Sequence, residues 1–329
     1  HIPAAQAAGA DVVAVADLDP ARRDAVGERF GIPGRYADAE AMLAAETLDG
    51  VMIATPHVVH FDPARAALAA GAHVLVEKPM VTNSADARAL VAAAQAAGRE
   101  VLVPCGWNFR PYTTAAAQWV AEGRIGAVRH IMCQMASALA DLMAGEPMLE
   151  TVEHMYRPPP STWADPARAG GYGWGQMSHS LAWVYCVADL KPTRVYCASG
   201  PSPSGVDYYD AAVVTFEGGA TMALSGAATT PKHRGIQMDI RIVGTEGMIL
   251  FDVERERLVL ARNDGADEEF PMAPGEGDYD GALPVQRFVA LCSGQDARND
   301  ANAENGARVV ETLDALYRSA ASGDPEAVK

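Results

Sequence analysis

Four short apolar runs, separated by helical segments, constrain the fold more than any other feature of this sequence. They are DVVAVAD (11–17), GVMIATP (50–56), HVLVEKP (73–79) and EVLVPCG (100–106). Each run is too short for a helix and lacks the apolar–polar alternation of a half-exposed strand, so we expect both faces of each strand to be covered. The pattern predicts a parallel sheet with helices on both sides.

The segments between these strands carry helix start and stop signals. Two of them, at 19–31 and 61–71, have an Asp-Pro pair at the start and a glycine at the end, and 84–98 has the same glycine. An aspartate caps the first free N–H groups, proline suits the first helical position, and glycine suits the stop. We therefore predict a Rossmann-type wound α/β domain over residues 1–106.

The pattern changes in the second part of the chain, where glycines sit at hairpin positions and few helices intervene. This predicts an α+β domain over 107–329 with a large, mainly antiparallel open sheet and a closing amphipathic helix at 304–323. The expected strands lie within 127–137, 210–228, 238–252 and 257–262. The irregular segment 145–175 is long enough to suggest a binding loop.

Composition excludes several classes of protein. A net charge of −16 argues against a nucleic-acid partner and against an anionic membrane surface, because both require a basic face. The five cysteines are irregularly spaced with no C-x-x-C, which indicates reduced thiols and no zinc site, so we expect a cytoplasmic protein without a metal. No apolar run approaches the roughly 18 residues of a membrane span.

Polar residues follow the predicted strands where ligands bind in wound sheets. Asp17, Thr55 with Pro56, and Glu77 with Lys78 stand at these ends. A carboxylate at the Asp17 position accepts hydrogen bonds from ribose hydroxyls and repels a 2′-phosphate, so NAD is predicted as the cofactor, with NADP less favoured. A helix cap or turn is the alternative role for Asp17.

The glycine-rich phosphate loop that normally precedes such an aspartate is absent from the printed sequence. HIPAAQAAG (1–9) has the character of the helix that should follow that loop. We therefore expect the first strand and its loop to be missing from this sequence.

Several motifs together resemble a known family. TPHVVH (55–60) followed by ALAAGAHVLVEKP (67–79) is similar to the Gfo/Idh/MocA oxidoreductases, and the similarity continues in GGYGWGQMSH (170–179) and VGTEGMILFD (243–252). The resemblance runs in order over nearly the whole chain. It implies an NAD(P)-dependent dehydrogenase acting on CH–OH groups of sugars, cyclitols or related polyols, assembled as a homodimer or homotetramer.

The resemblance also implies roles at the strand ends. Lys78 matches the active-site lysine, which would hydrogen-bond the substrate hydroxyl and stabilise alkoxide charge. Glu77 would offset that charge or lie near the cofactor, and Thr55 and Pro56 would line the cofactor site. His60 matches a position near the next helix, where a structural role is the alternative to a cofactor contact. Asn108 would reach toward the nicotinamide.

His179 matches the histidine of a glycine-rich family motif and is the candidate general base, because histidine titrates near neutrality. The family aspartate four residues earlier is replaced here by Gly175. The candidates to stand in for it are Gln176, Tyr156 and Tyr172.

Four further side chains are candidates for contacting a substrate. Two of them are aromatic, and aromatic faces suit sugar or flat cyclic rings. For each, core packing or a capping contact is an equal alternative. They are Arg110, Tyr156, Trp163 and Gln176.

Three classes of function agree with these motifs. The first is a dehydrogenase that moves a hydride between NAD and a secondary alcohol. The second is a non-redox enzyme that retains NAD and oxidises its substrate transiently to help eliminate a group or cleave a glycoside. The third is a protein that binds a dinucleotide as a sensor, against which Lys78 and His179 argue together.

The residue after Asp17 is leucine rather than a basic residue, so we predict that NAD binds more tightly than NADP. Titration of the protein with each dinucleotide, followed by calorimetry or fluorescence, measures the two affinities. Equal or reversed affinities would contradict the role of Asp17.

Overall fold

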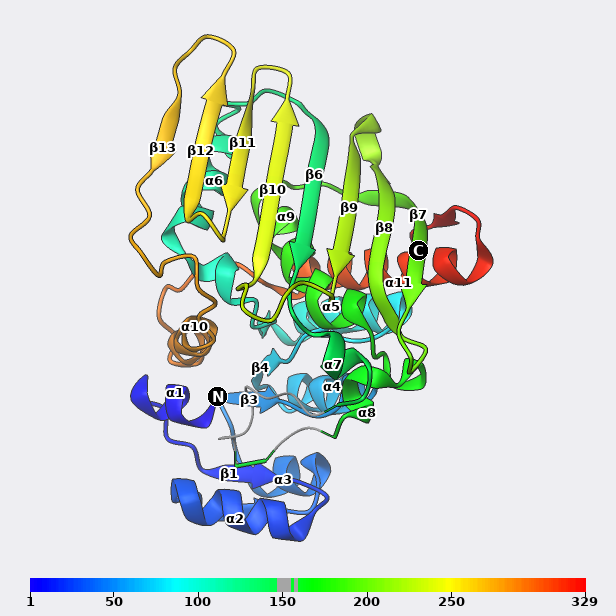
Figure 1. Cartoon of the computed structure of the whole chain (residues 1–329). Coiled ribbons are helices and arrows are strands. Elements are labelled where there is room, and N and C mark those ends of the chain that lie inside the picture. Colours follow the sequence, from blue (N-terminus) through cyan, green and yellow to red (C-terminus); the bar gives the residue numbers. More distant parts are fainter. Residues whose placement is uncertain (147–154, 157–158) are drawn as a thin grey trace.

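The computed structural model describes residues 1–146, 155–156 and 159–329, and Figure 1 shows their arrangement. The first third of the chain lies below a large sheet formed by the rest. Part of the predicted binding loop, residues 147–154 and 157–158, lies outside the described residues.

The first third contains the predicted short parallel strands with helices between them, so the prediction of a wound parallel sheet is confirmed. Among the described residues, β1 and β2 pair only with each other, while β3, β4 and β5 form a second parallel sheet in that order. The strand β2 was not predicted, because it has three residues and none of them is buried. The strands are β1 (Ala14–Ala16), β2 (Gly34–Tyr36), β3 (Gly50–Ile53), β4 (His73–Val76) and β5 (Val101–Leu102).

The helix α2 begins and ends at the predicted signals, whereas α4 begins one residue before its Asp-Pro pair, with His60 and not Asp62 at the N-cap position. The Asp19 carboxylate accepts hydrogen bonds from the first N–H groups of α2, and Pro20 takes the first helical position. Gly31 follows with a φ of 68°, a left-handed conformation that suits glycine. The helices of this part are α1 (Ile2–Ala7), α2 (Pro20–Phe30), α3 (Ala39–Ala45), α4 (Phe61–Ala69) and α5 (Ser84–Ala97).

The second part is built on a nine-stranded sheet in the order β13-β12-β11-β10-β6-β9-β8-β7-β14. All neighbours are antiparallel except β6 and β9, so the predicted mainly antiparallel sheet is confirmed. The strands are β6 (Val128–Ala136), β7 (Pro192–Pro201), β8 (Asp207–Phe216), β9 (Thr221–Ala227), β10 (Gln237–Gly244), β11 (Gly247–Asp252), β12 (Arg257–Arg262), β13 (Glu268–Phe270) and β14 (Glu326–Ala327).

Helices pack against one face of this sheet. In Figure 1, α6 (Pro111–Ala121), α9 (Ser178–Val187) and α11 (Ala303–Ser322) lie behind the strands. Trp183 of α9 is fully buried and stacks on Phe251 of β11, with ring centroids 4.5 Å apart. This contact is part of an apolar core that fixes α9, and with it the start of that helix, against the sheet.

The opposite face of the sheet carries a row of apolar side chains. Tyr196, Val213, Ala223 and Met132 are register neighbours on β7, β8, β9 and β6. Tyr196 is 45% exposed, Val213 51% and Met132 39%. A continuous exposed apolar row of this kind is typical of a surface that another molecule covers.

The last fifty residues join the two parts. The helix α10 (Ala282–Cys292) contacts α1 and β4, and the Val103 N–H donates to the Ala301 carbonyl at 2.9 Å. On α5, the Arg88 guanidinium pairs with Glu311 and Glu304 of α11. The C-terminal helices that we assigned to the second domain therefore also pack against the first.

Candidate active site

Lys78 lies just beyond β4 and connects the two parts of the molecule. Its ammonium group donates a hydrogen bond to the Gly175 carbonyl oxygen and lies 5.3 Å from the centroid of the Trp163 ring. A carbonyl and an aromatic face are neutral partners, so neither supplies the negative charge that usually accompanies a buried lysine.

Burial lowers the pKa of Lys78, while the negative charge of Glu77 opposes that shift. The Glu77 carboxylate itself lies 2.7 Å from His1 Nε2 and accepts a hydrogen bond from the Lys78 amide. Burial acts to raise the pKa of Glu77, but the His1 contact and the charges of His1 and Lys78 outweigh it and lower this pKa to about 2. Glu77 is therefore ionised at neutral pH, and it is the residue directly before Lys78 in the chain.

His179 stands in the first turn of α9, directly after a π-helical turn at Gly173–Met177. Its ring is buried, contacts Trp107 and Tyr279 edge-on at 5.5 and 5.2 Å, and its Nδ1 has no hydrogen-bond partner in the described residues. Burial and the charge of Lys78 hold its pKa well below the usual range. His179 is therefore neutral at pH 7, which leaves the imidazole able to accept a proton.

A second histidine, His57, was not predicted to belong to the site. Its Nδ1 lies 3.1 Å from the Ala169 carbonyl oxygen, and its ring meets Trp163 edge-on at 5.1 Å. Burial lowers its pKa to about 4 despite the contact with Ala169, and the charge of Lys78 adds to the effect. Trp163 thus lies between Lys78 and His57. The available sequence signal was the position of His57 directly after the strand-ending Pro56.

His60 was predicted to contact the cofactor, and its geometry argues for a different role. It is fully buried, with Nδ1 2.9 Å from the Pro79 carbonyl oxygen and Nε2 2.8 Å from the Thr55 carbonyl oxygen. Both ring nitrogens lie within hydrogen-bond distance of backbone carbonyl oxygens, so His60 joins the turn after β3 to the turn after β4.

Asp17 and Thr55 lie at the ends of β1 and β3, where ligands bind in wound folds. Asp17 Oδ1 accepts a hydrogen bond from the Asp19 amide at 2.8 Å, and Oδ2 lies 3.5 Å from Arg22 Nη1. The carboxylate thus has the turn contact that was the alternative role, and it remains partly exposed for a ligand. The Arg22 guanidinium also lies 5.5 Å from the Tyr156 ring, which places Tyr156 near this end of the crevice.

The side chains of Asn108 and Arg110 donate hydrogen bonds to backbone carbonyls. Asn108 is fully buried and donates to the carbonyls of Ala182 and Asp300, which uses both of its amide hydrogens. Arg110 donates to the Asp278 carbonyl at 2.9 Å. That bond holds the loop carrying Tyr279 against His179, so Arg110 supports the site without lining it.

The structure also shows what faces Lys78 in place of the family aspartate. Tyr172 is buried with its hydroxyl 3.0 Å from the Ser137 hydroxyl, so it does not stand in. For Gln176, no side-chain hydrogen bond is formed within the described part of the chain. The acceptor is the main-chain carbonyl of Gly175, the residue that replaces the aspartate.

The arrangement fits a dinucleotide and an alcohol. The strands β3 and β4 are parallel neighbours, so Thr55 and Lys78 lie at the same edge, and the chain at Ala54 and Thr55 is exposed there. An ammonium group has three hydrogens, of which the described residues accept one through Gly175. The remaining donors and the unpaired His179 nitrogen suit a ligand hydroxyl.

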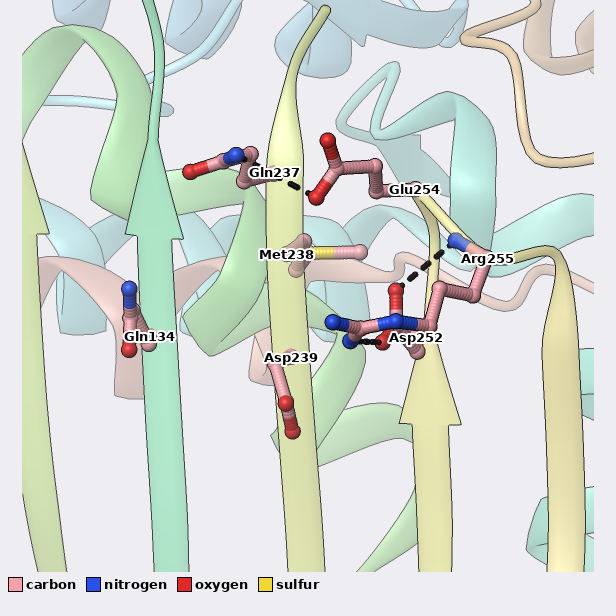
Figure 2. Close-up of a pocket in the computed structure, with 7 residues that line it drawn as sticks. All are labelled: Gln134, Gln237, Met238, Asp239, Asp252, Glu254 and Arg255. Carbon is pink, nitrogen blue, oxygen red and sulfur yellow. Dashed lines mark hydrogen bonds and ion pairs between the residues drawn. The ribbon is translucent and has the colours of Figure 1, made fainter. Parts of the chain in front are cut away.

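Figure 2 shows a separate hollow of about 240 Å³ on the large sheet. Its carboxylates all have partners: Asp252 pairs with Arg255 and Asp239 with Arg241, and Glu254 accepts a hydrogen bond from Gln237. None of the residues that line it belongs to the Lys78 site. In the described parts of the chain, no cluster of three potential metal ligands is found, and no helix has the length and apolar character needed to span a membrane.

Comparison with known proteins matches this geometry to a family. Residues 1–104 match the NAD-binding Rossmann fold of the GFO/IDH/MocA oxidoreductase family, and residues 113–250 match the GFO/IDH/MocA C-terminal domain. D-xylose 1-dehydrogenase (NADP(+)) 2 of Haloferax volcanii is 28% identical, over 98% of this chain and 93% of that protein. D-apiose dehydrogenase of Paraburkholderia graminis is 27% identical, over 96% of this chain and 82% of that protein.

Solved structures show the same fold. Levoglucosan dehydrogenase in complex with NADH superposes with a TM-score of 0.79 at 20% identity, covering 100% of this chain and 95% of that one. An inositol dehydrogenase homolog from Azotobacter vinelandii, complexed with NADH and myo-inositol, gives 0.76 at 21% identity, covering 99% and 93%. With both family domains matched in order, the chain belongs to the GFO/IDH/MocA oxidoreductase family, whose N-terminal domain is an NAD-binding Rossmann fold.

Proposed function

We propose that the protein is a dehydrogenase that transfers a hydride between NAD and a secondary alcohol of a sugar, cyclitol or related cyclic diol. The observation that carries the proposal is a partly buried ammonium, Lys78, whose charge acts on a buried neutral imidazole, His179, at the strand end of a Rossmann domain. The names of the relatives support the substrate class, because they include dehydrogenases of D-xylose, D-apiose and trans-1,2-dihydrobenzene-1,2-diol.

When bound, NAD supplies the site with a hydride acceptor. Asp17 would hold the ribose hydroxyls, and Thr55 and Pro56 would line the path of the cofactor toward Lys78. These residues lie at strand ends, where a wound fold leaves backbone groups open to a ligand.

Lys78 would bind the reacting hydroxyl through ammonium hydrogens that Gly175 does not accept. As the hydroxyl loses its proton, oxygen gains negative charge next to this ammonium. A fixed donor in a site shielded from water stabilises such charge far more than bulk water does. The hydrogen-bond partner of Lys78 is a neutral carbonyl, and the Glu77 carboxylate is bonded to His1 and to the Lys78 amide, which leaves the ammonium hydrogens available for the oxygen.

His179 would accept the hydroxyl proton. Its neutral state at pH 7 makes the ring an acceptor, and the nearby Glu77 carboxylate favours the imidazolium once the proton has arrived. The edge contacts with Trp107 and Tyr279 hold the ring in place during this transfer.

An NAD-retaining, non-redox enzyme is the second candidate, and the replacement of an aspartate by Gly175 favours it, since the charge next to Lys78 differs from the family pattern. The absorbance of reduced nicotinamide separates the two. A polyol and cyclic-diol panel should produce net accumulation of reduced cofactor if the protein is a dehydrogenase. Product formation without accumulation would favour the second candidate.

We predict that Lys78→Ala lowers kcat by about 10²–10³-fold, equivalent to roughly 3–4 kcal/mol of transition-state stabilisation, because a fixed electrostatic donor is lost. Affinity for NAD, measured by titration of the same variant, should change little. Lys78→Arg should also be inactive, because a planar guanidinium does not reproduce a compact ammonium.

The matched control is Lys191→Ala, since Lys191 is a surface lysine that pairs with Glu217 at 3.9 Å. Near wild-type turnover by Lys78→Ala would remove Lys78 from the mechanism. A second variant, His179→Ala, should slow the reaction most at low pH, where hydroxide cannot replace the base.

Because Lys78 donates to a neutral group, the Gly175 carbonyl, we can predict how activity depends on pH. Activity should fall at high pH as Lys78 loses its proton, and Gly175→Asp should raise the Lys78 pKa by placing a carboxylate beside it. We expect the high-pH limb of the kcat profile to move up by about one pH unit or more.

The atoms nearest to a Cβ at position 175 would be those of the Trp163 ring and Met143, at 3.5 to 3.6 Å, which is ordinary van der Waals contact for the Cβ. Gly175→Asn, which is equal in size and uncharged, is the control and should leave the limb in place. An equal shift in both variants would show that side-chain size, not charge, is responsible.

The exposed apolar row on the sheet is the basis for the proposed assembly. A homodimer or homotetramer would bury Tyr196, Val213 and Met132 against a second copy. We predict an oligomer in sedimentation velocity at micromolar concentration, and dissociation on Val213→Arg. The control Ala266→Arg adds the same charge to an exposed turn between β12 and β13. A monomeric wild-type protein would contradict this assembly.

A further inference from the structure

We propose that Asp207 and Tyr317 are positioning residues for Lys78, although neither contacts it. They would fix the backbone turn that presents the Gly175 carbonyl to the ammonium group. The inference rests on the role proposed for Lys78 and extends it to a network reaching the large sheet and the C-terminal helix.

The network begins with a carboxylate that accepts two hydrogen bonds. Asp207, the first residue of β8, accepts from the Gly173 amide through Oδ2 and from the Tyr317 hydroxyl through Oδ1, each at 2.8 Å. The Tyr317 oxygen in turn accepts from the Trp174 amide at 3.1 Å. The Trp174 and Tyr317 rings also stack, with centroids 5.3 Å apart and an interplanar angle of 5°.

Glycines at the start of this turn make the close approach possible. A Cβ atom at Gly171, whose φ is +114°, would lie 2.0 Å from Asp207 Oδ1. At Gly173 it would lie 2.7 Å from the Tyr317 hydroxyl. No larger residue fits at either position without displacing the network, which accounts for two glycines of the GGYGWG segment.

The held amides are those of the first two residues of the π-helical turn Gly173–Met177. The Gly175 amide donates back to the Gly171 carbonyl at 3.0 Å, and the Gly175 carbonyl faces Lys78. The next helix, α9, carries His179 in its first turn. One anchored turn therefore sets the positions of both groups proposed for catalysis. π-Helical turns are frequent at functional sites because they redirect a few residues within a helix.

The protonation states suit this role. Burial and the neighbouring Asp207 raise the pKa of Asp210 to about 8, so Asp210 holds a proton at neutral pH. Burial and the same carboxylates raise the pKa of Tyr317 far above its usual value, so its hydroxyl stays a donor. Burial also raises the pKa of the nearby Cys197 thiol to about 12, and burial with the charge of Asp210 raises the pKa of Tyr172. Asp207 thus remains an acceptor for two donors.

The test is Tyr317→Phe, which keeps the ring stacked on Trp174 and removes only the hydroxyl. The chain has four lysines, so the resonances of isotope-labelled lysine side chains can be assigned by substitution. We expect the Lys78 resonance and its titration midpoint to shift in the variant. We also expect kcat to fall about 10-fold or more, with the KM for NAD within about twofold, since small misplacements of a catalytic group reduce turnover strongly.

The matched control is Tyr185→Phe, which removes another buried hydroxyl bonded to α11, through Thr312 at 2.7 Å. It should leave the Lys78 resonance unchanged. A second variant, Asp207→Asn, puts an NH₂ group opposite one of the two donors and should shift the same resonance.

An unchanged Lys78 resonance in both Tyr317→Phe and Asp207→Asn would overturn the proposal, as would an equal shift in Tyr185→Phe. The NMR measurement needs no turnover. A shifted resonance in a protein that oxidises no alcohol would therefore uphold the positioning network and reject the proposed function.

Discussion

The buried ammonium group of Lys78 is the constraint on which the arrangement of the site depends. A buried charge must find an acceptor, and here the acceptor is a main-chain carbonyl from a segment almost a hundred residues away. Meeting that need fixes the end of β4 against the turn that begins α9. This contact and the one between His57 and the Ala169 carbonyl join the wound part to the segment before α9, and the Trp163 ring lies near both Lys78 and His57.

The two histidines near Lys78, His57 and His179, are neutral for a common reason. His57 and His179 are both buried, and burial lowers the pKa of each, so neither adds positive charge to the site at neutral pH. The ionised group nearby is Glu77, which is turned toward His1 and the Lys78 amide. The surroundings of Lys78 thus contain two neutral imidazoles and the Glu77 carboxylate, and the ammonium group is the positive charge available to an oxygen that becomes negative as it reacts.

The sequence alone was sufficient to predict the parallel strands, their polar ends and the mainly antiparallel second sheet, because burial on both faces and turn glycines leave local patterns. It did not predict the partner of Lys78, since the direction of a carbonyl depends on the π-helical turn and not on residue type. His60 and Asn108 were expected at the ligand, but backbone carbonyls engage their side chains. Tyr279, Asp207 and Tyr317 lie more than a hundred positions from Lys78, and no spacing rule links them to it.

The packing of the C-terminal helices bears on how the molecule unfolds. The pairing of Val103 with Ala301 and the ion pairs of Arg88 with α11 connect the wound part to the last helix, which itself covers the large sheet. A strand or helix that belongs to two cores cannot leave one without exposing the other. Heat or denaturant should therefore melt both parts in one cooperative transition, and mild proteolysis should not release the Rossmann part as an independently folded fragment.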